Sequence, residues 1–417
     1  MSSIILNDVN EAVSIALEQA TAASNQTTFA VGGLMVNNST GEVIYAIHNN
    51  VIIPLTNNMS FTFDPTAHGE RQLVYWYYEN KEALNLPEPS QLTVITSLDP
   101  CAMCAGALLT AGFNVGVSAI DTYAGINCAQ NFEFTTLPPN LRPVAQATFG
   151  YYASGPSCPP SLTRQYVGGS DVAFKEEVLT PANLLDCGSV FNQSVDTVRT
   201  TSNSSGLEPS QMQDPANLPV TSPIIAAYQK IYSKAFTIKI SDSRLPDQQI
   251  LDELQETLAS ASNAKNAVAF IDPFGNLVLC LADTFDLSPV HAAFMNVTQA
   301  YAKTRWGLMN EYEAGDIAEN PELYLTHPKY GTFVFLYAPD PYESNTTMIF
   351  GAYGSTMEGS IPNMFPTNFQ FYYPPSNGCN FAELAPVVNN LPPFYTESVN
   401  ISMMQVPFLV SNPTRNS

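Results

Sequence analysis

The chain carries little charge and very little positive charge. Only 12% of its 417 residues are charged, and 37 Asp and Glu outnumber 15 Lys and Arg, which gives a formal net charge of −22. The sequence contains no run of Lys or Arg, whereas binding to the phosphates of a nucleic acid needs clustered basic side chains. The composition therefore argues against a nucleic-acid partner.

Two further features are missing from the sequence. No apolar run is long enough to span a membrane, and residues 1–20 lack the basic start and apolar middle of a secretory leader. The seven cysteines show no tight disulfide-scaffold spacing. We therefore expect a cytoplasmic protein without a membrane partner, and nine Asn-x-Ser/Thr triplets leave secretion open.

The chemistry of the chain is concentrated in two short segments, Asp-Pro-Thr-Ala-His-Gly-Glu at 64–70 and Pro-Cys-Ala-Met-Cys at 100–104. Zinc takes nitrogen and sulfur ligands, and a catalytic zinc keeps three protein ligands and one open position. His68, Cys101 and Cys104 supply those three ligands. Glu70 is then free to act as the catalytic acid and base that moves protons beside the metal.

The order His-x-Glu and then Pro-Cys-x-x-Cys resembles that of the zinc nucleobase deaminases. Residues 1–150 are similar to the cytidine deaminase-like superfamily, nearest to its branch of tRNA adenosine deaminases and guanine deaminases. The His-Gly-Glu variant is also similar to that of fungal-type cytosine deaminases. The resemblance implies an α/β fold, a three-layer α-β-α domain with a mixed central sheet, and Zn²⁺ as the cofactor.

Hydrophobic periodicity predicts the order of elements in this first domain. The thiols of Cys101 and Cys104 should lie at the start of a helix, where the helix dipole favours thiolates. Helices are expected over 9–23, 66–81 and 100–111, and strands over 29–36, 42–47, 92–96 and 115–120.

Asn49 follows the second expected strand. The resemblance implies that an Asn at this position contacts the substrate base, and the alternative is a turn residue that satisfies only backbone groups. We interpret its neighbour His48 as structural. The segment 121–125 reads Asp-Thr-Tyr-Ala-Gly where tRNA adenosine deaminases commonly carry Asp-x-Lys-x-Gly, and the missing Lys is consistent with a small free substrate.

The rest of the chain divides into three parts. Residues 151–222 are rich in Pro, Gly, Ser and Thr and predict an irregular extension and a linker. Residues 223–359 repeat the order of elements of the first domain, so the domain is expected to be duplicated. Residues 360–417 form a tail rich in Pro and aromatic residues, which should wrap the surface.

The second copy lacks the zinc ligands. Aligning Asp340-Pro341 with Asp99-Pro100 puts Tyr342 and Asn345 where the first copy has its two thiols. His291 remains, and Ala293 stands in place of the catalytic carboxylate. We therefore expect a degenerate, zinc-less deaminase-like domain that packs on the first as an intramolecular pseudo-dimer, and a homodimer is also possible.

Together these features predict a zinc-dependent hydrolytic deaminase that releases ammonia from a free nucleobase or nucleoside, with an aminopurine such as guanine favoured and cytosine possible. One alternative keeps the chemistry and makes tRNA adenosine the substrate, against which the net charge counts. The other is a non-catalytic, zinc-stabilised binding or scaffold protein, in which Glu70 would have no purpose.

Overall fold

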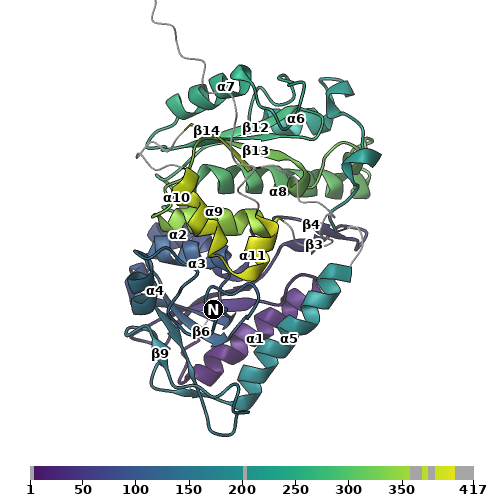
Figure 1. The fold of residues 1–417 in the computed structure, drawn as a ribbon. Coiled ribbons are helices and arrows are strands. Elements are labelled where there is room, and N and C mark those ends of the chain that lie inside the picture. The colour runs from purple at the N-terminus through teal and green to yellow at the C-terminus, as the bar shows by residue number, and fades with distance from the viewer. Residues whose placement is uncertain (1–3, 201–203, 357–368, 374–380, 400–417) are drawn as a thin grey trace, which may run out of the picture.

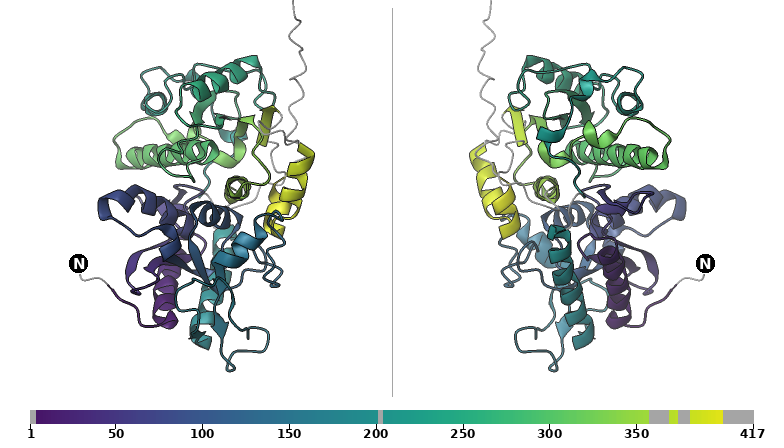
Figure 2. Two further views of the ribbon diagram at one scale, coloured as in Figure 1. Left: turned by 90° about the vertical axis from the view of Figure 1, so that its left-hand side faces the viewer. Right: turned by 90° about the vertical axis from the view of Figure 1, so that its right-hand side faces the viewer.

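Two β-sheets organise the chain, and each is flanked by helices on both faces (Figure 1). The computed structural model describes residues 4–200, 204–356, 369–373 and 381–399. The views in Figure 2 show the unit built from the first half of the chain and the unit built from the second half lying side by side. Helices from the two units meet between the sheets.

The first sheet is mixed and has the strand order β2-β1-β5-β6-β7-β9. Strand β1 is antiparallel to both β2 and β5, whereas β6 is parallel to both β5 and β7. The strands are β1 (Gly32–Asn37), β2 (Val43–His48), β5 (Leu92–Leu98), β6 (Asn114–Ala119), β7 (Phe149–Tyr151) and β9 (Val167–Gly168). Every residue of β5 and β6 is buried, because helices cover both faces of the sheet.

Two pairs of helices cover the first sheet. Helices α1 (Val9–Asn25) and α5 (Pro181–Thr200) pack together on one face, and α2 (Gly69–Leu84) and α3 (Ala102–Ala111) lie on the other. Helix α1 starts where the Asp8 side chain accepts hydrogen bonds from the backbone N–H groups of residues 10 and 11. This arrangement confirms the three-layer α-β-α architecture with a mixed central sheet.

The second sheet has the order β12-β11-β13-β14. Strand β11 is antiparallel to both β12 and β13, and β13 is parallel to β14. The strands β2-β1-β5-β6 of the first sheet pair in the same directions and in the same order. Helix α7 lies on its outer face, and α8 and α9 lie toward the first unit (Figure 1). The elements are α7 (Gln248–Ala259), β11 (Ala267–Ile271), β12 (Leu277–Ala282), α8 (Ala293–Ala314), β13 (Thr332–Tyr337), α9 (Ser344–Ser355) and β14 (Phe369–Tyr373).

Smaller elements connect these layers. They are β3 (Ile52–Pro54), β4 (Ser60–Thr62), α4 (Arg142–Thr148), β8 (Ala153–Ser154), β10 (Val178–Leu179), α6 (Pro223–Gln229), α10 (Phe381–Asn389) and α11 (Pro393–Ser398). The β3–β4 hairpin reaches the second unit, where Trp306 of α8 donates a hydrogen bond to the Ile53 carbonyl at 3.1 Å. Among the described helices, none combines the length and the apolar character needed to cross a membrane.

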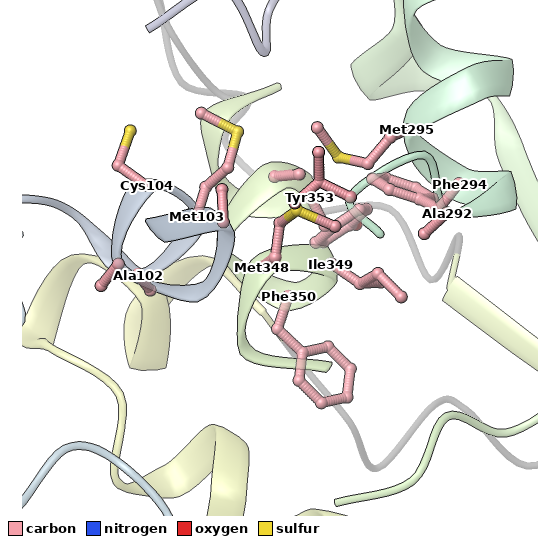
Figure 3. Packing of buried hydrophobic residues seen from close by; sticks show 14 of the residues in the cluster. Ala102, Met103, Cys104, Ala292, Phe294, Met295, Met348, Ile349, Phe350 and Tyr353 are labelled. Carbon is pink, nitrogen blue, oxygen red and sulfur yellow. The ribbon is translucent and has the colours of Figure 1, made fainter. Parts of the chain in front are cut away.

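Helices α3 and α9 make the closest contact between the two units. A Cβ atom added to Gly106 of α3 would lie 2.7 Å from the Met348 Cα atom, and one added to Gly351 of α9 would lie 2.6 Å from the Met103 Cα atom. Figure 3 shows Met103 and Met348 among the buried side chains that fill this contact. The two glycines let the helix backbones approach, and a single hydrophobic core runs through both units.

The structure differs from the sequence-based prediction at the start of α2, in residues 151–222 and in the C-terminal part of the chain. Helix α2 begins at Gly69 rather than at residue 66, because the carboxylate of Asp64 bonds the backbone and hydroxyl of Thr66 in the preceding turn. The predicted irregular segment 151–222 contains the 20-residue helix α5, whose buried side chains face α1. The predicted surface tail supplies strand β14 and helices α10 and α11, and its residues 360–368, 374–380 and 400–417 lie outside the described part.

We predict that Gly106→Ala destabilises the protein by ~1–3 kcal/mol, the usual cost of overpacking a core. The added methyl group would meet backbone atoms of α9, which cannot move aside as a flexible side chain can. Gly307→Ala in α8 is the matched control, because nothing lies within 4 Å of its added Cβ and alanine favours a helix by up to ~1 kcal/mol. Urea unfolding of both variants measures the difference, and a Gly106→Ala protein as stable as the control would contradict the packing described here.

Candidate active site

His68 is held in place by the turn that precedes α2. It is the residue immediately before the first helical residue, Gly69. The buried carboxylate of Asp64 pairs with Arg71 at 2.9 Å and also accepts the Thr66 backbone N–H at 2.8 Å. The buried ion pair and the hydrogen bonds of Asp64 therefore anchor the turn that carries His68.

Cys101 and Cys104 reach the same place from the loop after β5. Cys101 is the residue before α3 and Cys104 lies in its first turn. The ligand atoms of these cysteines and of His68 lie within 4.8 Å of one another, and Cys101 Sγ is 3.5 Å from His68 Nδ1. One nitrogen and two sulfurs at these separations fit a tetrahedral zinc ion with a fourth position left over.

The two thiols differ in acidity. The Cys104 thiol, hydrogen-bonded to Cys101, holds the pKa of Cys101 well below its usual range, and His68 acts in the same direction. Burial raises the pKa of Cys104. A thiolate is the form that binds a metal, and both cysteines would bind a zinc ion in that form.

Glu70 lies in the first turn of α2, beside the candidate metal ligands. It is 2% exposed, and its Oε1 accepts a hydrogen bond from the Thr96 hydroxyl at 3.0 Å. Burial raises the pKa of Glu70, and the negative charge of Cys101 adds to this effect. Burial therefore favours the protonated form of this carboxyl group, which is the form that can donate a proton.

These groups open into one cavity of about 250 Å³, which His68, Glu70, Cys101 and Asn49 all line. The sequence analysis predicted these four lining residues together with buried Cys104, and the structure brings all five together. Aromatic side chains form much of the remaining wall, and they are Phe29, Tyr123, Phe191, Phe394 and Tyr395. Such a wall suits a flat ring.

Asn49 is buried, and its side chain is bonded to the backbone. Its Oδ1 accepts the Gly69 N–H at 2.7 Å, and its Nδ2 donates to the Phe29 carbonyl at 3.0 Å. The residue therefore fixes the start of α2 while it lines the cavity. Its neighbour His48 lies beside Gln19, with 3.0 Å between Nδ1 and Oε1, in keeping with a structural role.

Sequence reasoning missed two walls of the cavity. Helix α5 contributes Phe191 and Arg199, among others. Buried residues recur along α5 at Leu184, Cys187, Ser194 and Val198, and this helical spacing is a signal that could have revealed it.

The second missed wall is α11, which comes from the C-terminal part of the chain. The backbone N–H of Phe394 donates to the Tyr123 carbonyl at 3.2 Å, and the Tyr123 hydroxyl donates to Glu397 at 2.6 Å. Tyr395 is fully buried, and its hydroxyl hydrogen-bonds Cys101. Helix α11 thus completes the site formed by the first half of the chain, and no local sequence pattern predicts this contact.

The comparisons with known proteins agree with this site. Residues 6–119 match the family described as the cytidine and deoxycytidylate deaminase zinc-binding region. No significant sequence match to a curated protein is found.

Two solved structures are similar to parts of the chain. One comes from a study of tRNA:A34 deaminases and is 25% identical over 28% of this chain and 80% of its own, with a TM-score of 0.22. The other, a guanine deaminase from Nitrosomonas europaea, is 14% identical over 46% of this chain and 87% of its own, with a TM-score of 0.30. With its zinc-binding region in residues 6–119, the N-terminal unit belongs to the cytidine deaminase-like superfamily.

Proposed function

We propose that the protein is a zinc-dependent hydrolytic deaminase of a free nucleobase or nucleoside, with His68, Cys101 and Cys104 as the zinc ligands. The observation that carries the proposal is the position of Glu70, a buried carboxyl group that lines one cavity with the metal ligands. A zinc ion bound there would lower the pKa of a water molecule toward ~7.

The chain's own residues would then move the protons. Glu70 is placed to take the proton of the attacking water, to pass it to the ring nitrogen and then to the departing amine, so that ammonia leaves. The Thr96 hydroxyl, 3.0 Å from Glu70 Oε1, orients the carboxyl group. Asn49 would present its remaining hydrogen-bonding capacity to the substrate base.

The cavity favours a small, flat substrate. Its aromatic walls suit a ring, and its volume of about 250 Å³ is small for a ligand site. We favour an aminopurine such as guanine over cytosine because the motif around His68 and Cys101 resembles the adenosine and guanine deaminase branch. The net charge of −22 counts against tRNA adenosine as the substrate.

A non-catalytic zinc-stabilised scaffold is the second candidate. Its zinc site would be closed by a fourth protein ligand. Here three ligand atoms come together beside a buried acid in an open cavity. Ammonia release in a screen of free bases, nucleosides and nucleotides separates the two functions, because the scaffold releases none.

We further propose that residues 223–359, together with β14, form a degenerate second deaminase-like domain that packs on residues 1–150 as a pseudo-dimer. Support comes from the second sheet, which repeats the strand order and directions of the first. The contact between α3 and α9 would be the interface of this pseudo-dimer.

The purified chain should bind about one equivalent of zinc. Among the residues that the structure describes, one group of His and Cys ligands comes together, and it lies in the first unit. Metal analysis after dialysis measures the stoichiometry, and Cys101→Ala should lose the metal. A second tightly bound zinc ion would contradict the assignment of a metal-free second unit.

Glu70→Gln should keep the fold and the zinc ion and lose turnover by ~10²–10⁴-fold, the usual contribution of general acid–base catalysis. The amide has the size of the carboxyl group and cannot exchange protons at neutral pH. Glu79→Gln, on an exposed position of the same helix, is the matched control and should retain the activity. A Glu70→Gln enzyme with a near-normal rate would assign the proton transfers to another group.

Tyr395→Phe should weaken zinc binding. It removes the hydroxyl group that hydrogen-bonds Cys101, and loss of a group that supports a metal ligand typically costs ~10–100-fold in affinity or activity. Competition with a chelator measures the change. Tyr330→Phe, which loses a hydrogen bond to Glu208 outside the lining of the cavity, should bind zinc normally, and equal affinities in the two variants would refute a role for α11 at the metal site.

A further inference from the structure

A second cavity, of about 280 Å³, lies in the second unit. It opens at the start of helices α8 and α9, and among its lining residues are Asp283, Phe294 and Glu343. The catalytic cavity opens in the same way at the start of α2 and α3. The two cavities therefore have corresponding positions in their units.

The start of α8 reproduces the start of α2. Asp283 Oδ1 accepts the backbone N–H of the first helical residue, Ala293, at 2.7 Å, as Asn49 Oδ1 accepts that of Gly69 at 2.7 Å. The residue before each helix has the same backbone conformation, with φ −68° and ψ 150° at Ala292 and φ −71° and ψ 150° at His68. Ala292 therefore occupies the position of His68.

This register corrects the alignment made from sequence by one residue. His291, which the sequence comparison places at the metal, instead lies beside Ser288, with 3.0 Å between Nδ1 and Oγ, and packs edge-on against Tyr75. Phe294, rather than Ala293, takes the position of Glu70.

The start of α9 shows the same shift. Glu343 precedes α9 as Cys101 precedes α3, and Thr346 follows three residues later as Cys104 does. The sequence comparison instead placed Tyr342 and Asn345 at these positions. In the second unit, other residues thus stand in place of both thiols, the imidazole and the acid. The cavity at these positions is nevertheless similar in size to the first.

The chemistry of the cavity indicates what it can hold. Phe285 and Tyr337 are part-exposed and offer aromatic surface, and the carboxylate of Glu343 offers exposed oxygen acceptors. The Oδ1 of Asn345 is buried and has no hydrogen-bond partner, whereas its Nδ2 donates to the Pro289 carbonyl at 3.1 Å. A ligand with N–H groups would satisfy the Glu343 carboxylate directly, and it would satisfy the Asn345 oxygen once that side chain turns toward the cavity.

The charges disfavour an anion. Asp283, Asp340 and Glu343 line the cavity, and the cation among its lining residues is Lys265. The Lys265 ammonium already pairs with Glu343 at 3.3 Å, and its side chain is 70% exposed. A phosphate group would meet more negative than positive charge there.

We propose that this second cavity binds, without turning over, a planar nitrogen heterocycle that carries N–H donors, the chemical class to which the aminopurines belong. The aromatic side chains would stack on the ring, and Glu343 and Asn345 would accept its N–H groups. No turnover is expected, because Ala292 and Phe294 replace the imidazole and the acid.

The test is a calorimetric titration of the zinc-loaded full chain with 2,6-diaminopurine, in a Glu70→Gln background that prevents turnover. Glu343→Gln and Asn345→Leu should each weaken one binding event by about tenfold or more, since each removes an acceptor for the N–H groups of the ligand, and at Glu343 a charged one. Glu311→Gln, at an exposed position of α8, is the control and should leave the titration unchanged. Thermal melting shows whether each variant is folded.

A titration that neither cavity variant changes would overturn the proposal, as would binding of inorganic phosphate that depends on Lys265. The outcome is independent of the function proposed for the first cavity. Glu343→Gln with Glu70 intact should release ammonia at the normal rate, and a chain that deaminates no base at all would still show the loss of binding in the Glu343 and Asn345 variants.

Discussion

The close contact of α3 with α9 is the constraint on which the rest of the structure depends. Gly106 and Gly351 bring the two backbones together, so the buried side chains of both units form one core. Cys101, a candidate metal ligand, immediately precedes α3, and Glu343 of the second cavity immediately precedes α9. The position of each site is therefore set by a helix that belongs to the interface, and neither unit can shift without moving a cavity wall.

The candidate active site is built from groups that are costly to bury. The Asp64–Arg71 pair and the carboxyl group of Glu70 are almost fully removed from water. The pair satisfies its own charges and fixes the turn before His68, whereas Glu70 keeps a raised pKa because burial disfavours its charged form. The packing of the surrounding core offsets the cost of this burial, and the result is an acid positioned beside the candidate metal ligands.

Much of the first unit could be predicted from its sequence because its signals are local. The candidate metal ligands and Glu70 lie within two short motifs, and alternating or helical hydrophobic patterns mark the elements around them. Helix α5 was hidden by the polar composition of its neighbourhood, although its buried positions have helical spacing. The contact of Tyr395 with Cys101 joins residues almost 300 positions apart, and the one-residue shift in the second unit depends on where α8 begins. Only tertiary packing determines these two features.

The central claim is that His68, Cys101 and Cys104 together bind one zinc ion and leave a position open. X-ray absorption at the zinc edge of the metal-loaded protein tests it most directly. The account predicts two sulfur ligands at ~2.3 Å and one nitrogen ligand at ~2.0 Å, with an oxygen ligand from water in the remaining position. A shell of four protein ligands, or one without the two sulfurs, would contradict a catalytic zinc centre at this site.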